Sequence, residues 1–188
     1  MANWNRALFD AIYSFSHRSA LLDALGVFLA QYLAYILVLV FLILVLSHPG
    51  RRRRLAYLFE GGLAIIVSRG ILTELIRFVY PHQRPFQALE FRPLIVDNAN
   101  SFPSGHAAFF FALSYVIFTR NKKWGLFFFA ASFVVCIARI YAGVHWPADI
   151  AGGILVGLFS GVFVHYLLKP YVEKLDPAHR VISSEVTQ

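Results

Sequence analysis

The sequence predicts an all-α protein, a polytopic bundle of transmembrane helices, and its composition and apolar runs carry that prediction. Of its 188 residues, 59% are hydrophobic and only 14% are charged, and the mean hydropathy is +0.63. Soluble domains contain about 45–50% apolar and about 25% charged residues. Too few charges remain here to cover a water-exposed surface, and several apolar runs approach the length of a membrane helix.

Five apolar segments are expected to cross the bilayer within a single domain that covers residues 1–170. The expected spans are residues 21–46, 55–79, 104–119, 124–140 and 148–168. A helix needs about 20 residues to cross about 30 Å of hydrocarbon, so the third segment must tilt little or use flanking residues. Gly153, Gly157 and Gly161 recur every fourth residue of the fifth segment, a spacing that indicates close helix packing.

The two ends of the chain differ from these segments. Residues 1–20 are expected to contain an interfacial amphipathic helix, because apolar side chains recur there at helical spacing. Those side chains are Trp4, Leu8, Ile12 and Phe15. The stretch has no continuous apolar core, so it is unlike a cleaved signal peptide. Residues 171–188 form a polar C-terminal tail, and the single cysteine excludes a disulfide within the chain.

The basic residues predict the orientation of the bundle. Residues 51–54 are four consecutive arginines, residues 120–123 read RNKK, and the tail carries Lys169, Lys174 and Arg180. With five spans these three places lie on one side, which the positive-inside rule assigns to the cytoplasm. The net charge of +7 is therefore mainly a topology signal, and no nucleic-acid partner is expected.

Polar residues that are rare in membrane segments collect on the opposite, outer side. They are Arg77, Arg84, Ser104, His106, Arg139, His145 and Asp149. Ionisable groups at this depth are costly unless they are paired or functional. Arginine forks suit phosphate oxygens, and the turn at residues 103–105 precedes a helix N-terminus, where free N–H groups favour an anion. The set therefore predicts a phosphate site.

The histidines of this set indicate catalysis. A neutral imidazole can attack phosphorus, and a second imidazole can protonate the departing oxygen. Asp149 follows His145 by four residues, and its carboxylate could accept the imidazole N–H and fix the tautomer. Phosphoryl transfer requires positioning and positive charge above all, which the arginines supply without a metal.

Three segments in this order resemble the type 2 phosphatidic acid phosphatase superfamily, whose helical core is shared with vanadium haloperoxidases. They read RFVYPHQRP at residues 77–85, PSGH at 103–106 and RIYAGVHWPAD at 139–149. The resemblance implies that His145 is a nucleophile that becomes phosphohistidine, that His106 is the general acid and that Asp149 orients His145. It also implies five phosphate-binding residues and no cofactor or metal. The five are Arg77, Arg84, Ser104, Gly105 and Arg139.

Two positions depart from the pattern of the superfamily. Its first motif usually begins with lysine, where this chain has Arg77, and its third usually has a serine where this chain has Ala138. Arginine keeps the charge but changes the geometry, which puts the role of Arg77 in doubt. Alanine removes one hydroxyl that could donate a hydrogen bond to the phosphate.

The short length and the N-terminal stretch LFDAIYSFSHRSALLDALGVFLAQY resemble bacterial undecaprenyl-diphosphatases of the bacitracin-resistance type. This resemblance implies a multi-pass protein of the bacterial cytoplasmic membrane. Its active site would face the periplasm or the extracellular side. Its substrate would be a polyprenyl diphosphate in the bilayer, cut to undecaprenyl phosphate and inorganic phosphate. Such hydrolysis recycles the carrier for cell-wall synthesis and supports bacitracin resistance.

Other functions remain open at this point. The lipid could be phosphatidylglycerophosphate, phosphatidic acid or a lipid A phosphate, because the catalytic residues recognise only phosphate. A binding or transport protein for lipid phosphates and a vanadate-dependent haloperoxidase are further alternatives. His165 is interpreted as structural and His82 as a solvated loop residue. Whether Glu60, Arg69 and Glu74 pair within their helix or line a groove is left open.

Overall fold

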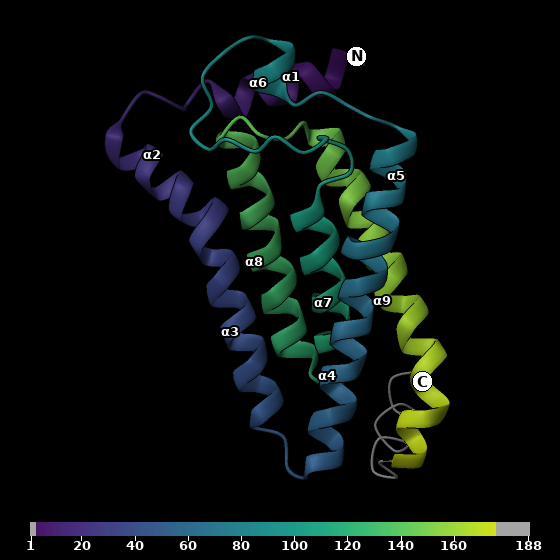
Figure 1. The fold of residues 1–188 in the computed structure, drawn as a ribbon. Coiled ribbons are helices and arrows are strands. Elements are labelled where there is room, and N and C mark those ends of the chain that lie inside the picture. The colour runs from purple at the N-terminus through teal and green to yellow at the C-terminus, as the bar shows by residue number, and fades with distance from the viewer. Residues whose placement is uncertain (1–2, 176–188) are drawn as a thin grey trace.

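A computed structural model of the chain describes residues 3–175, which form helices and connecting loops without a strand. Four helices in this range are long and apolar enough to cross a membrane: Ala20–Leu46, Arg51–Val79, Lys122–Tyr141 and Pro147–Val172. They lie side by side as a bundle in Figure 1. The predicted all-α transmembrane architecture is thereby confirmed.

The first two of these long helices each contain a π-helical segment. The first consists of α2 (Ala20–Val27), the π-helical η1 (Phe28–Tyr32) and α3 (Leu33–Leu46). The second consists of α4 (Arg51–Ile65), the π-helical η2 (Ile66–Leu72) and α5 (Thr73–Val79). The other two long helices are α8 (Lys122–Tyr141) and α9 (Pro147–Leu175).

The expected third span corresponds to α7 (Gly105–Arg120), the central helix of the bundle. Its 16 residues reach about 24 Å at 1.5 Å per residue, which is less than the hydrocarbon thickness. Most of its side chains are buried, and it packs against α8, α9 and α4. Ser101, Pro103 and Ser104 before it are also buried. Irregular backbone at membrane depth is tolerated where protein surrounds it.

A row of glycines brings α9 onto the backbone of α7. A Cβ atom at Gly153 would lie 2.5 Å from the Ser104 carbonyl oxygen, and one at Gly157 would lie 2.6 Å from the Ala108 carbonyl oxygen. Any side chain at these positions would push the two helices apart. The close packing expected from the glycine spacing is therefore present, and it fixes the start of α7 beside the start of α9.

Helix α1 (Asn3–Tyr13) lies across one end of the bundle (Figure 1). Its inner face buries Phe9, and Asn5 accepts a hydrogen bond from the Ala148 N–H at 2.9 Å. Trp4 and Leu8 remain exposed on the outer face. An apolar outer face on a helix that runs across the bundle end suits a position in the membrane interface.

The two ends of the bundle carry different loops (Figure 1). The basic residues 51–54 and 120–123 lie in or beside the turns at the end opposite α1. The long loop of residues 80–104 and the turn of residues 142–146 lie at the α1 end. The basic turns and the predicted phosphate residues are thus separated by the length of the bundle. Helix α9 runs to Leu175, and residues 176–188 of the expected tail lie outside the described residues.

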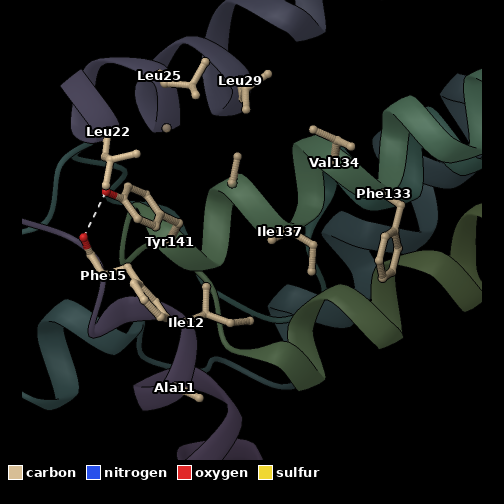
Figure 2. Close-up of a pocket in the computed structure, with 12 residues that line it drawn as sticks. Ala11, Ile12, Phe15, Leu22, Leu25, Leu29, Phe133, Val134, Ile137 and Tyr141 are labelled. Atoms are coloured by element: carbon tan, nitrogen blue, oxygen red, sulfur yellow. Dashed lines mark hydrogen bonds between the residues drawn. The ribbon is translucent and has the colours of Figure 1, made fainter. Parts of the chain in front are cut away.

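The outer faces of the long helices are apolar. Leu39, Phe59, Leu126 and Phe159 are each more than half exposed, as expected for side chains that contact lipid. Figure 2 shows an apolar groove of about 490 Å³ between α1, α2 and α8, lined by residues such as Ile12, Leu25 and Ile137. The Tyr141 hydroxyl donates to the Phe15 carbonyl oxygen at its edge, at 3.2 Å.

Candidate active site

Arg84 ties the long loop to the turn between α8 and α9. The residue precedes the short helix α6 (Pro85–Ala88), and its side chain is fully buried. Its Nε donates to the Ala99 carbonyl oxygen at 2.8 Å, and its Nη1 donates to the Val144 carbonyl oxygen at 2.7 Å. Two segments far apart in the sequence therefore meet around one guanidinium.

Asp97 links two of the predicted phosphate-binding arginines. Its Oδ2 lies 2.8 Å from Arg84 Nη2 and 3.1 Å from Arg139 Nη2. Burial alone would raise the pKa of Asp97, but Arg84, the Ala99 N–H and Arg139 outweigh it and hold the pKa below its usual range. The carboxylate is therefore charged at neutral pH, and it occupies the forks that would bind an anion.

His145 and Asp149 form a buried pair at the start of α9. The His145 Nδ1 and Asp149 Oδ2 atoms are 3.4 Å apart, and the same oxygen accepts hydrogen bonds from the Trp146 N–H at 2.7 Å and the Ser101 hydroxyl. With the Nδ1 proton directed at Asp149, the lone pair is on Nε2, where it accepts a hydrogen bond from Arg84 Nη1. This Nε2 lies 3.4 Å from Arg84 Nη1, within the arginine cluster.

The environment of His145 favours a neutral imidazole. Burial, helped by the nearby Arg139 and Arg84, lowers the pKa of His145 to about 4, although the contact with Asp149 opposes the change. A neutral imidazole with its lone pair on Nε2 has the form that a nucleophile requires, once a phosphate replaces this atom as the partner of Arg84.

Gly143 shapes the turn that presents His145. Its φ of 81° lies in the left-handed region, which glycine adopts without steric cost. A Cβ atom there would also lie 2.8 Å from the Phe91 ring. The backbone between α8 and α9 can therefore reverse tightly, with Val144 and His145 held against the long loop.

The turn at residues 103–105 begins α7 beside this pair. The Ser104 N–H donates to the Asp149 carbonyl oxygen at 2.9 Å, and the Ser104 Oγ caps the helix by accepting from the Ala107 N–H at 3.5 Å. His106 follows in the first turn, is partly exposed, and lies within electrostatic reach of Arg139, His145 and Arg84. The structure thus brings the PSGH motif close to the His145–Asp149 pair and to Arg84 and Arg139.

Arg77 approaches the same turn from α5. Its side chain is 6% exposed, and its Nη2 donates to the Pro103 carbonyl oxygen at 3.2 Å. Its Nη1 lies 3.3 Å from Glu74 Oε1, and its carbonyl oxygen accepts from Asn100 Nδ2 at 3.1 Å. The arginine that replaces the usual lysine therefore faces the start of α7.

Ala138, the other departure from the motif, precedes Arg139 in α8. It is buried in an apolar cluster with Ala30, Ala142 and Val144, and it lines the groove of Figure 2. This apolar cluster includes Ala142 and Val144 of the turn that carries His145. Alanine at 138 therefore suits the apolar packing of this cluster.

Three residues of the site are absent from the predicted catalytic and phosphate-binding set. Asp97 bridges Arg84 and Arg139, His82 Nδ1 lies 3.7 Å from Asp149 Oδ1, and Arg69 reaches Gly105, where a Cβ atom would lie 2.4 Å from Arg69 Nε. His82 belongs to the first motif and was interpreted as solvated, yet its side chain is only 24% exposed. Asp97 and Arg69 lie outside the motifs, and only their charge in an apolar chain could have marked them.

The cluster combines four arginines with three carboxylates. The arginines are Arg69, Arg77, Arg84 and Arg139, and the carboxylates are Glu74, Asp97 and Asp149. One positive charge remains in excess, beside the free N–H groups of a helix start. Among the described side chains, no group of three or more His, Cys, Asp or Glu is arranged to hold a metal ion. The site can bind an anion and present an imidazole to it.

Comparison with known proteins agrees with this chemistry. Residues 60–173 match the family described as the PAP2 superfamily. The undecaprenyl-diphosphatase BcrC of Bacillus subtilis strain 168 is 31% identical over 98% of this chain and 96% of its own length. The bacitracin transport permease protein BcrC of Bacillus licheniformis is 31% identical over 87% of this chain and 78% of its own length.

A solved structure has the same fold. The crystal structure of LpxE from Aquifex aeolicus superimposes with a TM-score of 0.71 and 29% identity, and the match covers 86% of this chain and 94% of that one. The family match covers more than half of the chain and includes all three motifs. Together with the transmembrane bundle and the arginine–histidine cluster, these similarities establish that the chain belongs to the PAP2 superfamily and is a membrane lipid phosphatase.

Proposed function

We propose that this protein hydrolyses undecaprenyl diphosphate to undecaprenyl phosphate and inorganic phosphate. The observation that carries the proposal is the buried His145, which is held neutral with its Nδ1 toward Asp149 and its Nε2 among arginines. The similarity to an undecaprenyl-diphosphatase over nearly the whole chain supports the choice of lipid.

The first chemical step transfers the terminal phosphoryl group to the enzyme. The Nε2 lone pair of His145 attacks the terminal phosphorus, and the bond from phosphorus to the bridging oxygen breaks. The bond's electron pair stays on that oxygen, and the departing undecaprenyl phosphate takes a proton from His106. Asp149 stabilises the positive charge that develops on the imidazole of His145.

The second step releases phosphate and restores the enzyme. A water molecule gives one proton to His106 and attacks the phosphorus of the phosphohistidine. The phosphorus–nitrogen bond breaks, its electron pair returns to Nε2, and inorganic phosphate leaves. Arg77, Arg84 and Arg139, the Ser104 hydroxyl and the Gly105 N–H bind the phosphoryl oxygens in both steps, because charge on these oxygens dominates the transition state.

Asp97 has to give way before a phosphate can bind these arginines. Its carboxylate bridges Arg84 and Arg139, at 2.8 and 3.1 Å. A phosphate oxygen can take over both contacts, since guanidinium forks bind carboxylate and phosphate in the same way.

We place the site on the outer face of the bacterial cytoplasmic membrane. The basic turns lie at the opposite end of the bundle, and the positive-inside rule puts such turns in the cytoplasm. Hydrolysis on the outer face would return the carrier lipid to cell-wall synthesis. It would also remove the diphosphate form of the carrier, in support of bacitracin resistance.

The test is phosphate release by the purified protein in detergent with EDTA. Undecaprenyl diphosphate and phosphatidylglycerophosphate are offered in turn to wild type and to His145→Ala. We expect release from the diphosphate by wild type, and loss of it in the variant by a factor of about 10⁴ or more.

Other outcomes would change the proposal in different ways. Release from phosphatidylglycerophosphate alone would leave the mechanism in place and overturn the substrate. Release that survives in His145→Ala would overturn the nucleophile. No release from either lipid would favour a transport protein, as the name of the B. licheniformis relative suggests.

A further inference from the structure

Three charged side chains form a ladder along η2 and α5, beside the start of α7. Arg69 pairs with Glu74, and Arg77 Nη1 lies 3.3 Å from the same Glu74 oxygen. Glu74 thus bridges two arginines within one membrane helix. Charged groups at such positions are rare in membrane helices and generally mark a functional site.

The π-helical segment η2 makes the ladder possible. The Thr73 N–H and hydroxyl both donate to the Ser68 carbonyl oxygen, five residues earlier, the hydroxyl at 2.8 Å. In an α-helix, side chains three or four residues apart share a face, whereas i→i+5 bonding brings residues five apart together. Arg69 and Glu74 are five apart, so the π-helix aligns them.

Arg69 extends from the ladder to the phosphate turn. A Cβ atom at Gly105 would lie 2.4 Å from Arg69 Nε and 2.8 Å from Arg69 Cδ. Glycine is therefore the residue that admits the arginine side chain against the first turn of α7. The Arg69 guanidinium lies beside the free N–H groups of that turn, which already favour an anion.

Two side chains of this ladder are exposed and the third is buried. The side chains of Arg69 and Glu74 are 39% and 52% exposed, whereas Arg77 is 6% exposed. Arg77 Nε is buried and has no hydrogen-bond partner among the described residues, so this guanidinium retains a donor for an anion.

Glu74 and Asp97 are held in the same way. Asp97 bridges Arg84 and Arg139 beside His145, and Glu74 bridges Arg69 and Arg77 beside Gly105. Carboxylate and phosphate occupy arginine forks alike. The site therefore contains two neighbouring arginine pairs, each bridged by one internal carboxylate and each left with one positive charge.

We propose that Arg69, together with Arg77, forms a second phosphate subsite, which binds the lipid-proximal phosphate of a lipid diphosphate once Glu74 is displaced, so that Arg77 binds both phosphates. The inference rests on the proposed function, because only a diphosphate fills both arginine pairs. The terminal phosphate has to lie at His145, so the next phosphate lies toward Arg77. The lipid chain then leaves past the exposed side of η2 into the bilayer.

The subsite is tested with two substrates that differ by one phosphate, farnesyl diphosphate and farnesyl monophosphate. Arg69→Gln should reduce the preference for the diphosphate, measured as the ratio of kcat/KM values, by about 10- to 100-fold, as expected for a lost hydrogen bond to a charged group. Arg69→Lys keeps the charge and should restore part of the preference. Arg52→Gln, the same change at the basic end of the same helix, should leave the ratio unchanged.

Glu74→Gln separates a binding subsite from a merely structural ion pair. We expect it to lower KM for farnesyl diphosphate, because the internal competitor is gone, whereas Arg69→Gln raises this KM. A structural pair would make both variants less stable to heat and reduce hydrolysis of both substrates by the same factor. That result, or an unchanged ratio in Arg69→Gln, would overturn the subsite alone. Wild type that cleaves the monophosphate but not the diphosphate would overturn the proposed function as well.

Discussion

The bundle buries two clusters of charge, one at each end, and they differ in composition and support. At the basic end, Glu60 pairs with Arg120 and accepts from His165 Nδ1 at 2.8 Å. The Arg120 guanidinium also lies 5.5 Å from the centre of the Tyr57 ring. These residues stand on α4, α7 and α9, three helices that pack together.

The cluster at the other end stands partly on loops and turns. Arg84 and Asp97 belong to the long loop and His145 to the α8–α9 turn, whereas Arg139 closes α8. The Glu60 cluster balances one carboxylate with one arginine, whereas the candidate site has an excess of arginine. Burial is similar in both, so burial alone does not distinguish a structural ion pair from a functional site. The charge excess and the loop positions do.

The largest expected effect is a loss of activity on changing a residue of the candidate site. His106→Ala should slow farnesyl monophosphate hydrolysis by about 10²–10⁴-fold, because the departing alcohol needs a proton from the general acid. Hydrolysis of farnesyl diphosphate should slow by a smaller factor, because a departing phosphate with a pKa near 6 depends less on a proton from His106 than an alcohol does, and the loss of water activation is shared by both substrates. Phosphate release from both substrates measures the difference.

The control for His106 is the melting temperature in detergent, which should stay close to that of wild type because the side chain is partly exposed. Equal losses with both substrates would contradict the assignment of His106 as the acid for the leaving group.

The next effect separates the clusters by stability. Glu60→Gln leaves Arg120 buried without its carboxylate, which should cost about 3–5 kcal/mol of unfolding free energy. The folded fraction should keep its wild-type kcat, since the site lies at the other end. Denaturant unfolding in detergent measures the loss, and the double variant with Arg120→Gln should lose less than Glu60→Gln alone. Reduced kcat with unchanged stability would make this cluster functional.

Asp97→Asn should change both stability and phosphate binding. Asp97 is an ion-pair partner of Arg84 and Arg139, and it competes with phosphate for them. Loss of its charged contacts with Arg84 and Arg139 should lower stability by about 1.5–3 kcal/mol. Orthovanadate, an analogue of phosphate, should then stabilise the variant more than it stabilises wild type. Thermal unfolding with and without vanadate measures this. Glu60→Gln is the control, and an equal vanadate shift in all three proteins would exclude competition by Asp97.

The smallest effect is a difference in titration. Burial lowers the pKa of His145 to about 4, so its imidazole should remain neutral as the pH falls through 6.5 and should become charged only near pH 4. NMR of 13C-labelled histidines in the substrate-free protein can follow this, with His145→Ala for assignment. A His145 signal that titrates at 6.5 or above would contradict the buried, neutral nucleophile.

The sequence predicts the helices and motif residues well because both depend on local patterns. Long apolar runs define the helices, and fixed spacing marks Arg84, His106 and His145. Asp97 escapes prediction because its contacts with Arg84 and Arg139 depend on the path of an irregular loop. The sequence leaves the Arg69–Glu74 pair as one of two alternatives, because i→i+5 bonding leaves no signal in an apolar segment. Glu60 finds partners on other helices, which a pattern within one helix cannot reveal.

The π-helical segment η2 also changes the direction in which side chains point along its membrane helix, so that the faces of α4 and α5 are not in register. A turn with i→i+5 bonds contains an extra residue, so it rotates everything after it relative to everything before it. The α4 half keeps Glu60 directed at α7 and α9, while the α5 half directs Arg77 at the start of α7. A regular helix would couple these two orientations, so that a change suited to one end disturbed the other. Because of this offset, the catalytic end and the anchoring end of one continuous helix can be adjusted separately during evolution.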